Sequence, residues 1–414
     1  MKALNLVFAV TLIGFIGVNA SRVVLQLYAL DLGASPTQVG VLIALYYVCP
    51  LLLSWPAGTW GDRYGPLRPL VFSALCGAGG LLIPYYVHNL PALYIAGTLS
   101  GMSFAFFLVI VQNLVGIMSA PENRATSFSN FSLVGATSNF IGPLVAGFSI
   151  DHFSYPIACV VAGAFALMTG VVVLAGRKIL PGGSRRSAPR PPIGKTLRDP
   201  AVMRILVIGA LVQLGTDLFQ FYIPVYGVGI GLSASAIGVL LATFAVASFI
   251  VRFALPRLVK RLGEDKLLAY SFYIAAVGFA LVPLFQDVVM LALVSFIFGL
   301  GTGCGQPIAT MLMFSRATDG RSGEALGLRL TVNNLVRVIA PALFGFIVSG
   351  FGLAPVFYIN AAMMGAGGLV SRKPSASPER PSAARLNISI VAIGWPQPVP
   401  RPNINDTSAS ITTC

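Results

Sequence analysis

The chain has 414 residues, of which 56% are hydrophobic and 10% are charged, and its mean hydropathy is +0.84. This composition excludes a soluble globular domain. The net charge of +14 would suggest nucleic acid as a partner of a soluble protein, but here the basic residues gather in short loops and tails, which favours a membrane protein without a nucleic-acid partner.

Apolar runs of about 20 residues recur along the chain, and each is long enough to cross a hydrocarbon layer of about 30 Å. Inside lipid the backbone hydrogen bonds must close within each segment, so the runs are predicted to be helices. The fold class is therefore all-α and integral to the membrane. We expect twelve spans, at residues 4–30, 37–58, 67–87, 91–118, 125–150, 156–176, 202–226, 235–255, 266–285, 288–314, 324–349 and 354–370.

The connections are short except for residues 177–200, which are rich in Arg, Pro, Gly and Ser and read as a flexible basic linker. The linker separates an N-terminal six-helix bundle (1–176) from a C-terminal six-helix bundle (201–370). Residues 371–414 have the composition of a disordered tail. The five cysteines form no CxxC pairs, so we expect no disulfide framework, metal site or cofactor.

The two bundles are related in sequence by one ungapped offset of 198 residues. A single offset that serves three separate places indicates an internal repeat. The matched positions are Gly33, Ser35 and Gly40 with Gly231, Ser233 and Gly238, then Arg63 and Gly65 with Arg261 and Gly263, then Pro143 and Gly147 with Pro341 and Gly345.

The loops on one side hold Lys and Arg, whereas the loops on the other side hold none and contain Asp31, His88, Asp151, His152 and Asp287. Cytoplasmic loops are the ones that carry an excess of Lys and Arg. We therefore expect a multi-pass protein of the cytoplasmic (inner) membrane, with both termini, the linker and the tail in the cytoplasm.

A short charged segment, Gly58-Thr-Trp-Gly-Asp62-Arg63-Tyr-Gly65-Pro-Leu-Arg68, joins the second and third spans. This hairpin resembles the signature loop of the major facilitator superfamily of transporters. The resemblance implies two six-helix bundles around a cavity that opens to one side at a time. It also implies that Gly58, Asp62, Arg63, Gly65 and Arg68 form a conformational latch, in which Asp62 meets the start of the eleventh span near Gly323-Glu324.

Charged side chains inside a bilayer are costly and mark functional sites. Asp217 is the acid that lies inside a span away from its ends, and Arg22, Arg252 and Arg337 are comparable arginines. Arg252 also lies close enough to the cytoplasm to extend its charged group there. We expect the substrate or a coupling ion to contact Asn19, Arg22, Gln26, Asp217, Gln220 and Arg337. The structural alternative is an ion pair, such as Arg22 with Asp217, that only holds helices together.

The fifth span contains Gly142-Pro143-Leu-Val-Ala-Gly147, and Pro341 repeats Pro143 in the eleventh span. Proline removes a backbone donor, so a helix bend is expected at each. The segment resembles the Gly-Pro motif of drug–proton antiporters in the superfamily. The fourth span departs from that pattern, because Gly97 stands where those antiporters have an arginine that is tied to proton coupling.

These observations predict a secondary active transporter, and not an enzyme, that moves a small solute as a monomer with a proton as coupling ion. The Gly-Pro motif favours export of drug-like or hydrophobic compounds. Three intramembrane arginines against one acid favour a small organic anion instead. A membrane sensor that does not transport is the third reading.

Overall fold

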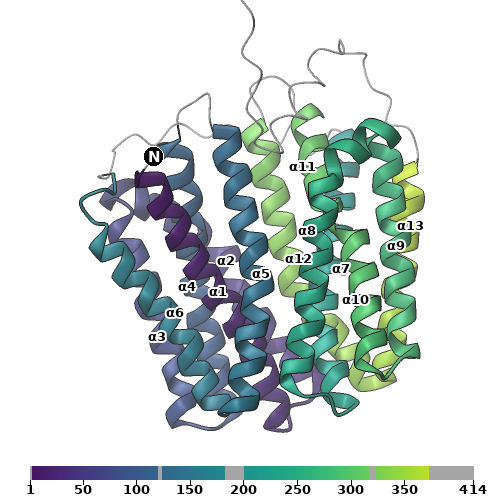
Figure 1. Cartoon of the computed structure of the whole chain (residues 1–414), viewed down its shortest axis with the longest axis horizontal. Helices are drawn as coiled ribbons and strands as arrows, with labels where there is room; N and C mark the ends of the chain where they lie inside the picture. Colours follow the sequence, from purple (N-terminus) through teal and green to yellow (C-terminus); the bar gives the residue numbers. More distant parts are fainter. Residues whose placement is uncertain (1, 120–123, 182–199, 317–321, 373–414) are drawn as a thin grey trace, which may run out of the picture.

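The structure is a computed structural model that describes residues 2–119, 124–181, 200–316 and 322–372. Within these residues twelve helical spans are long and apolar enough to cross a membrane. The helices form two groups that stand side by side (Figure 1). Most of the predicted linker and tail, residues 182–199 and 373–414, lie outside the described part of the chain.

The first half consists of six long helices. These are α1 (Lys2–Asp31), α2 (Pro36–Tyr64), α3 (Leu67–Tyr86), α4 (Leu90–Met118), α5 (Arg124–His152) and α6 (Tyr155–Ala175). The second half has α7 (Pro200–Gly229), α8 (Ala234–Leu262), α9 (Glu264–Leu281) with a 3-10 turn (Val282–Leu284), α10 (Val288–Gly303), α11 (Gly305–Arg316), α12 (Ser322–Phe351) and α13 (Leu353–Arg372).

The repeat is visible in the backbone as well as in the sequence. Gly33 and Gly231 have φ angles of 78° and 80°, and Gly65 and Gly263 have φ angles of 80° and 77°. These left-handed values favour glycine, which explains why the turns keep it. Ser35 and Ser233 both cap the following helix with φ −66° and ψ 157°. The two halves therefore use the same turn and cap chemistry at equivalent places.

The predicted span 288–314 is not one helix, because it breaks at Cys304 into α10 and α11. Residue 307 is proline, so the carbonyl of Gly303 has no amide hydrogen four residues later to accept from. The side chain of Arg252 supplies a donor instead, with its Nε 3.1 Å from that carbonyl oxygen. The tenth membrane span, Val288–Ala309, therefore contains the break between α10 and α11.

Two crossed pairs of helices join the halves, α2 with α12 and α5 with α8. Glycine brings the backbones together at both crossings. A Cβ added to Gly40 would lie 2.4 Å from the carbonyl oxygen of Pro341, and one added to Gly238 would lie 2.6 Å from that of Pro143. We call these two crossings, α2 with α12 and α5 with α8, the seam between the halves. The Gly-Pro segments therefore lie at the seam, inside helices that continue through both prolines.

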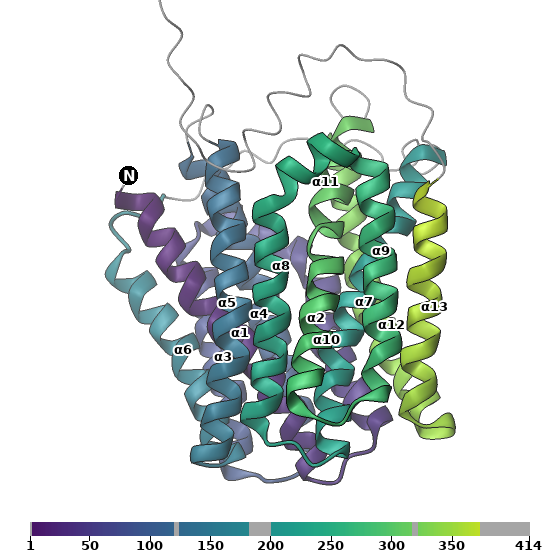
Figure 2. The same cartoon turned by 45° about the vertical axis from the view of Figure 1, so that its right-hand side comes forward.

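The remaining helices lie farther from the seam. In Figure 1, α3 and α6 lie at one edge of the molecule and α9 and α13 at the other, and Figure 2 shows α13 beside α9 at the edge of the second half. The last span, predicted as residues 354–370, is a helix of 20 residues, which is long enough to cross a membrane.

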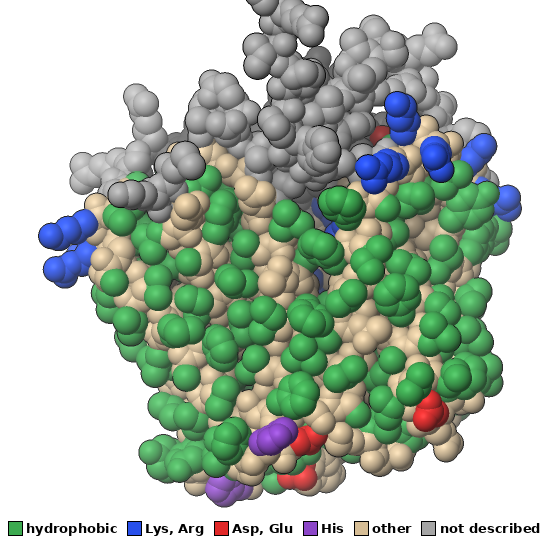
Figure 3. All heavy atoms as spheres, viewed as in Figure 1, with side chains coloured by type: hydrophobic (Ala, Val, Ile, Leu, Met, Phe, Trp, Pro, Cys, Tyr) green, Lys and Arg blue, Asp and Glu red, His purple; other side chains and the backbone are tan. Residues whose placement is uncertain are grey.

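Charged side chains divide between the two ends of the helices (Figure 3). We call the end with Arg63, Arg68, Lys260 and Arg261 the basic end. The end with Asp31, Asp151, Asp287 and both histidines is called the opposite end.

Candidate functional site

Arg22 of α1 reaches across the seam. Its guanidinium donates hydrogen bonds to Gln220 Oε1 at 2.5 Å, Tyr47 Oη at 2.8 Å and Asn19 Oδ1 at 3.4 Å. Arg22 and Gln220 are 198 residues apart, so they occupy equivalent positions in the repeat. A contact between equivalent positions lies on the axis that relates the two halves. The hydrogen bond between them therefore marks the centre of the polar site.

Asp217 of α7 pairs with Arg337 of α12. Arg337 Nε lies 3.1 Å from Asp217 Oδ2, and the Asp217 side chain is only 7% exposed. Gln213, one helical turn away, donates to the same oxygen at 2.7 Å. The pairing of Asp217 with Arg22, which the sequence suggested as the structural alternative, is replaced by this ion pair. The three partners of Arg22 given above are uncharged.

Tyr47 of α2 connects the two arginines, and it was not among the residues predicted from the sequence. Its hydroxyl accepts from Arg22, and the guanidinium carbon of Arg337 lies 5.3 Å from the centre of its ring. That second contact is a cation–π interaction across the seam. An aromatic residue in an apolar span is usually core, as its neighbour Tyr46 is, so composition alone does not distinguish the two.

A chain of hydrogen bonds leads from Asp217 toward the basic end. Gln213 accepts from Gln306 of α11 at 3.1 Å, and Gln306 Oε1 in turn accepts from Arg329 of α12. Arg329, like Gln213, is less than a tenth exposed. Gln213 and Asp217 are four residues apart and so lie on one face of α7, whereas the sequence alone does not indicate that Gln306 and Arg329 contact that face.

The structure thus brings five of the six predicted site residues together, in two networks that Tyr47 joins: Asn19, Arg22 and Gln220 in one, Asp217 and Arg337 in the other. Gln26 is 2% exposed, and within the described residues its Oε1 has no hydrogen-bond partner. Gly142 holds α5 against this site, because an added Cβ would lie 2.5 Å from the Cβ of Asn19.

Arg252 does not extend toward the solvent as one reading of the sequence suggested. It is half-buried, and its Nε binds the Gly303 carbonyl at the break between α10 and α11.

The predicted latch segment is mostly helical, because α2 continues to Tyr64 and only Gly65 and Pro66 separate it from α3. Gly65 makes the turn, whereas Gly58 lies within α2. Arg63 and Arg68 lie on the ring of Tyr64, with centroid distances of 5.3 and 5.7 Å. The side chains of Asp62 and Glu324 lie outside the described part of the chain, so their contact stays a prediction.

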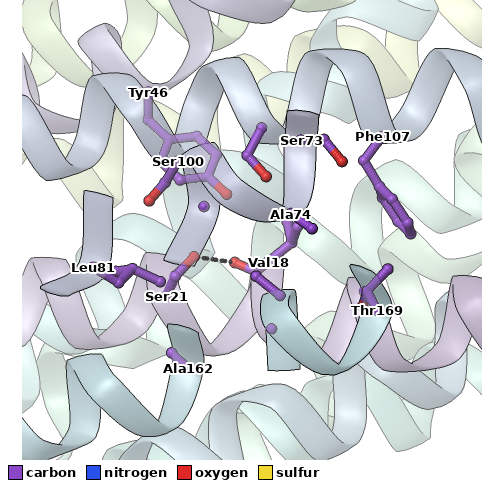
Figure 4. Close-up of a pocket in the computed structure, with 15 residues that line it drawn as sticks. Val18, Ser21, Tyr46, Ser73, Ala74, Leu81, Ser100, Phe107, Ala162 and Thr169 are labelled. Carbon is purple, nitrogen blue, oxygen red and sulfur yellow. Dashed lines mark hydrogen bonds between the residues drawn. The ribbon is translucent and has the colours of Figure 1, made fainter. Parts of the chain in front are cut away.

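A small pocket lies within the first half, lined by residues of α1, α2, α3, α4 and α6 (Figure 4). Ser21 faces it while donating to the Val18 carbonyl at 2.9 Å. The hydroxyls of Tyr46 and Ser100 also line it, and neither has a hydrogen-bond partner within the described residues. Ser21 and Tyr46 directly neighbour Arg22 and Tyr47, so α1 and α2 present the polar site and this pocket on different faces. In the part of the chain that the structure describes, no group of His, Cys, Asp and Glu could hold a metal ion.

Comparison with known proteins agrees with the fold. The sequence model of the Major Facilitator Superfamily matches residues 7–341 and 230–405. The quinolone resistance protein NorA of Staphylococcus aureus (strain COL) is 22% identical over 355 residues, which cover 83% of this chain and 89% of the relative. An uncharacterized MFS-type transporter of Methanocaldococcus jannaschii is 19% identical over 378 residues, covering 89% and 97%.

Solved structures resemble the whole fold at low identity. A peptide transporter POT in complex with sulfate has a TM-score of 0.76 at 17% identity, over 89% of this chain and 93% of that one. The nucleoside transporter NupG has a TM-score of 0.72 at 12% identity, over 89% and 98%. Fold, repeat and sequence thus agree on a multi-pass membrane transporter architecture, and the chain belongs to the Major Facilitator Superfamily.

Proposed function

We propose that the chain is a secondary active transporter that exports small hydrophobic or drug-like compounds, with proton entry at Asp217 as the driving step. The observation that carries the proposal is the Asp217–Arg337 ion pair beside the seam, linked through Tyr47 to Arg22 and Gln220. A titratable acid at the contact between two repeats is where alternating access would use a coupling ion. The name of the NorA relatives supports export of drug-like compounds.

In this proposal one chain is sufficient, because its two halves together supply the polar site. The protein would sit in the cytoplasmic membrane with the basic end and both termini in the cytoplasm. A proton on Asp217 would neutralise the acid and leave Arg337 without its counterion. Compound and proton would then exchange across the seam as the halves rock about the site.

The test is export by purified protein in proteoliposomes that carry a pH gradient. Wild type is expected to move a fluorescent lipophilic compound against its gradient, and Asp217→Asn is expected to abolish accumulation while leaving the protein folded. Gln38→Ala, which removes one contact of the capping box of α2 at the opposite end, serves as a control distant from the polar site. Unchanged accumulation in Asp217→Asn would remove Asp217 from the coupling step, and no movement of any compound would favour the sensor reading.

A second candidate, transport of a small organic anion, is supported by Arg22. Its three partners named above are neutral, and Asp217 is engaged by Arg337, so the site carries excess positive charge. A carboxylate could replace Gln220 or Tyr47 as the acceptor of Arg22.

Thermal unfolding separates the two candidates. A ligand at 100 times its dissociation constant adds about 2.7 kcal/mol to the free energy of unfolding. Stabilisation by aromatic and aliphatic carboxylates that Arg22→Gln removes would favour the anion, whereas stabilisation by lipophilic cations that Asp217→Asn removes would favour drug export.

A further inference from the structure

The hydrogen-bond chain between Arg329 and Asp217 has a fixed direction. Arginine only donates hydrogen bonds, and an ionised carboxylate only accepts them. Between these two ends, each amide has to accept at its oxygen and donate from its nitrogen. Arg329 donates to Gln306 Oε1, Gln306 Nε2 donates to Gln213 Oε1, and Gln213 Nε2 donates to Asp217 Oδ2.

The first half has apolar residues at the positions equivalent to this hydrogen-bond chain. The offset of 198 places Phe15, Leu108 and Phe131 at the positions equivalent to Gln213, Gln306 and Arg329. Phe15 and Phe131 pack edge to face with ring centroids 5.8 Å apart. An apolar contact therefore suffices to hold the equivalent helices in the first half. Helix packing alone therefore does not explain why the second half has polar residues at these positions.

Gln306 lies directly after the break in the tenth span. The break is flanked by Gly303 and Gly305, and Pro307 prevents an uninterrupted helix through it. The short helix α11 is therefore not continuous with α10 and can shift relative to it at this break. Gln306, in its first turn, ties it to α7 and α12.

The opposite face of α7 is firmly packed. Phe219 stacks on Phe298 of α10 with a centroid distance of 4.3 Å and also contacts Phe244 of α8 and Phe279 of α9. Any rearrangement of the chain is thus expected to displace α11 and not α7.

We infer that Gln213 and Gln306 make the position of α11 depend on the charge of Asp217. Protonation neutralises Asp217, which weakens the charge-assisted hydrogen bond from Gln213, and a proton on Oδ2 itself turns that oxygen into a donor, so that both ends of the chain donate. Whichever way the two amides turn, one donor then faces another, and releasing Gln306 removes the conflict. Gln213 and Gln306 are positioning residues in this scheme, which rests on the proposed protonation of Asp217.

Several other groups face Asp217 and set the background for its charge. Arg337 of α12 binds it, Arg22 of α1 lies nearby across the seam, and Arg329 reaches it through the two amides. Tyr47 of α2 is the titratable group between the first two arginines. Helices α8, α9 and α10 pack against the other face of α7 through the phenylalanines described above.

Cys304, a fully buried residue at the break, provides a native reporter. The protein would carry it as the sole cysteine, and its modification by a maleimide would be timed at pH 6 and pH 8. Dividing each rate by that of the unfolded protein at the same pH removes the intrinsic reactivity of the thiol. For wild type we expect a normalised rate on the order of tenfold higher at pH 6, about the equilibrium effect of one charge-assisted hydrogen bond.

Gln306→Met keeps the length of the side chain and removes its hydrogen bonds, so the normalised rate should be high at both pH values. Gln213→Met cuts the chain at its other link but leaves Gln306 bound to Arg329 and to the Gly209 carbonyl. Its normalised rate should therefore no longer depend on pH, which covers the case in which one variant fails to fold. Gln38→Met, at the opposite end and away from the polar site, is the matched control and should keep the wild-type ratio. Equal wild-type rates at the two pH values, or a wild-type ratio in both chain variants, would overturn the inference.

Labelling requires no transported compound, so the two proposals fail separately. A pH-dependent rate in a protein that exports nothing would leave the coupling intact and remove the proposed function. Export that depends on Asp217, together with a labelling rate that does not change with pH, would leave the proposed function intact and remove the coupling.

Discussion

At the scale of single residues, the ion pair of Asp217 and Arg337 places two opposite charges together beside the seam. Each charged group interacts with the other instead of with water. The sequence alone does not predict this pairing. Composition identifies a charge inside a span, but the choice of partner depends on helix rotation and on which helices meet. The offset of 198 indicates which residues lie near the axis between the halves, but it does not indicate which of them form pairs.

Removing one member of the pair should cost more than removing both. Arg337→Gln leaves the Asp217 carboxylate without a counterion, and the loss of a partner in a buried pair costs about 3 kcal/mol. Asp217→Asn in the same protein removes the stranded charge, so the double variant should recover most of the stability. Thermal unfolding of the four proteins in one detergent measures this, and additive losses would show that the two side chains do not interact.

Tyr47 should show two separable contributions. Tyr47→Phe removes the acceptor of Arg22 and keeps the ring under Arg337, whereas Tyr47→Leu removes both contacts. A hydrogen bond to a charged group contributes about 1.5–3 kcal/mol. A cation–π contact adds about 0.5–2 kcal/mol. The unfolding midpoint should therefore decrease from wild type to Tyr47→Phe and again to Tyr47→Leu. Equal midpoints for the two variants would exclude the ring contact.

At the scale of elements, the break between α10 and α11 shows where sequence reading fell short. The run 288–314 is mostly apolar, so hydropathy predicts one span, and its alternating glycines indicate either close packing or flexible, unwound backbone. Close packing agrees with the structure: a Cβ on Gly299 would lie 2.4 Å from the Phe244 carbonyl oxygen, and one on Gly301 would lie 2.6 Å from the Ala275 nitrogen. The position of the break is explained by Pro307, which has no backbone amide hydrogen to donate.

Arg252 and Pro307 should therefore be coupled. Arg252→Met leaves the Gly303 carbonyl without its side-chain donor, at a cost of about 1–3 kcal/mol for an unsatisfied buried group. Pro307→Ala restores a backbone donor for that carbonyl, so Arg252→Met should cost much less in its presence. A double-mutant cycle by thermal unfolding measures the difference, and equal costs in both backgrounds would contradict this role of Arg252.

At the scale of the whole molecule, the twelve spans, the two halves and the repeat followed from the sequence because each rests on local chemistry. Length and hydropathy fix a span, and glycine with serine fixes a turn and a cap. The seam was harder to predict. Only three-dimensional packing shows that α5 meets α8, that α2 meets α12, and that the Gly-Pro segments lie at those contacts.

The seam is closed at the opposite end by two equivalent but chemically different contacts. The Asp151 carboxylate of α5 accepts from the backbone nitrogens of Ala234 and Ser235 at 3.1 and 2.8 Å, at the start of α8. The offset of 198 maps these positions onto Ser349 and Thr37, whose hydroxyls lie 2.7 Å apart between α12 and α2. One contact has a negative charge at a helix N-terminus, and the other pairs two neutral hydroxyls.

Asp151→Ala should therefore open this end more readily than Ser349→Ala does. An acidic side chain that caps a helix contributes about 1 kcal/mol, which corresponds to a roughly fivefold change in the ratio of open to closed forms. An exposed hydrogen bond between two hydroxyls contributes less, since water replaces it readily. Spin labels at Phe153 and Leu284, which are exposed at this end on different halves, report the separation as a distance distribution. The longer-distance population should grow in Asp151→Ala and change little in Ser349→Ala. Equal growth in both would mean that the charge contributes nothing, and the two contacts would then be equivalent in strength as well as in position.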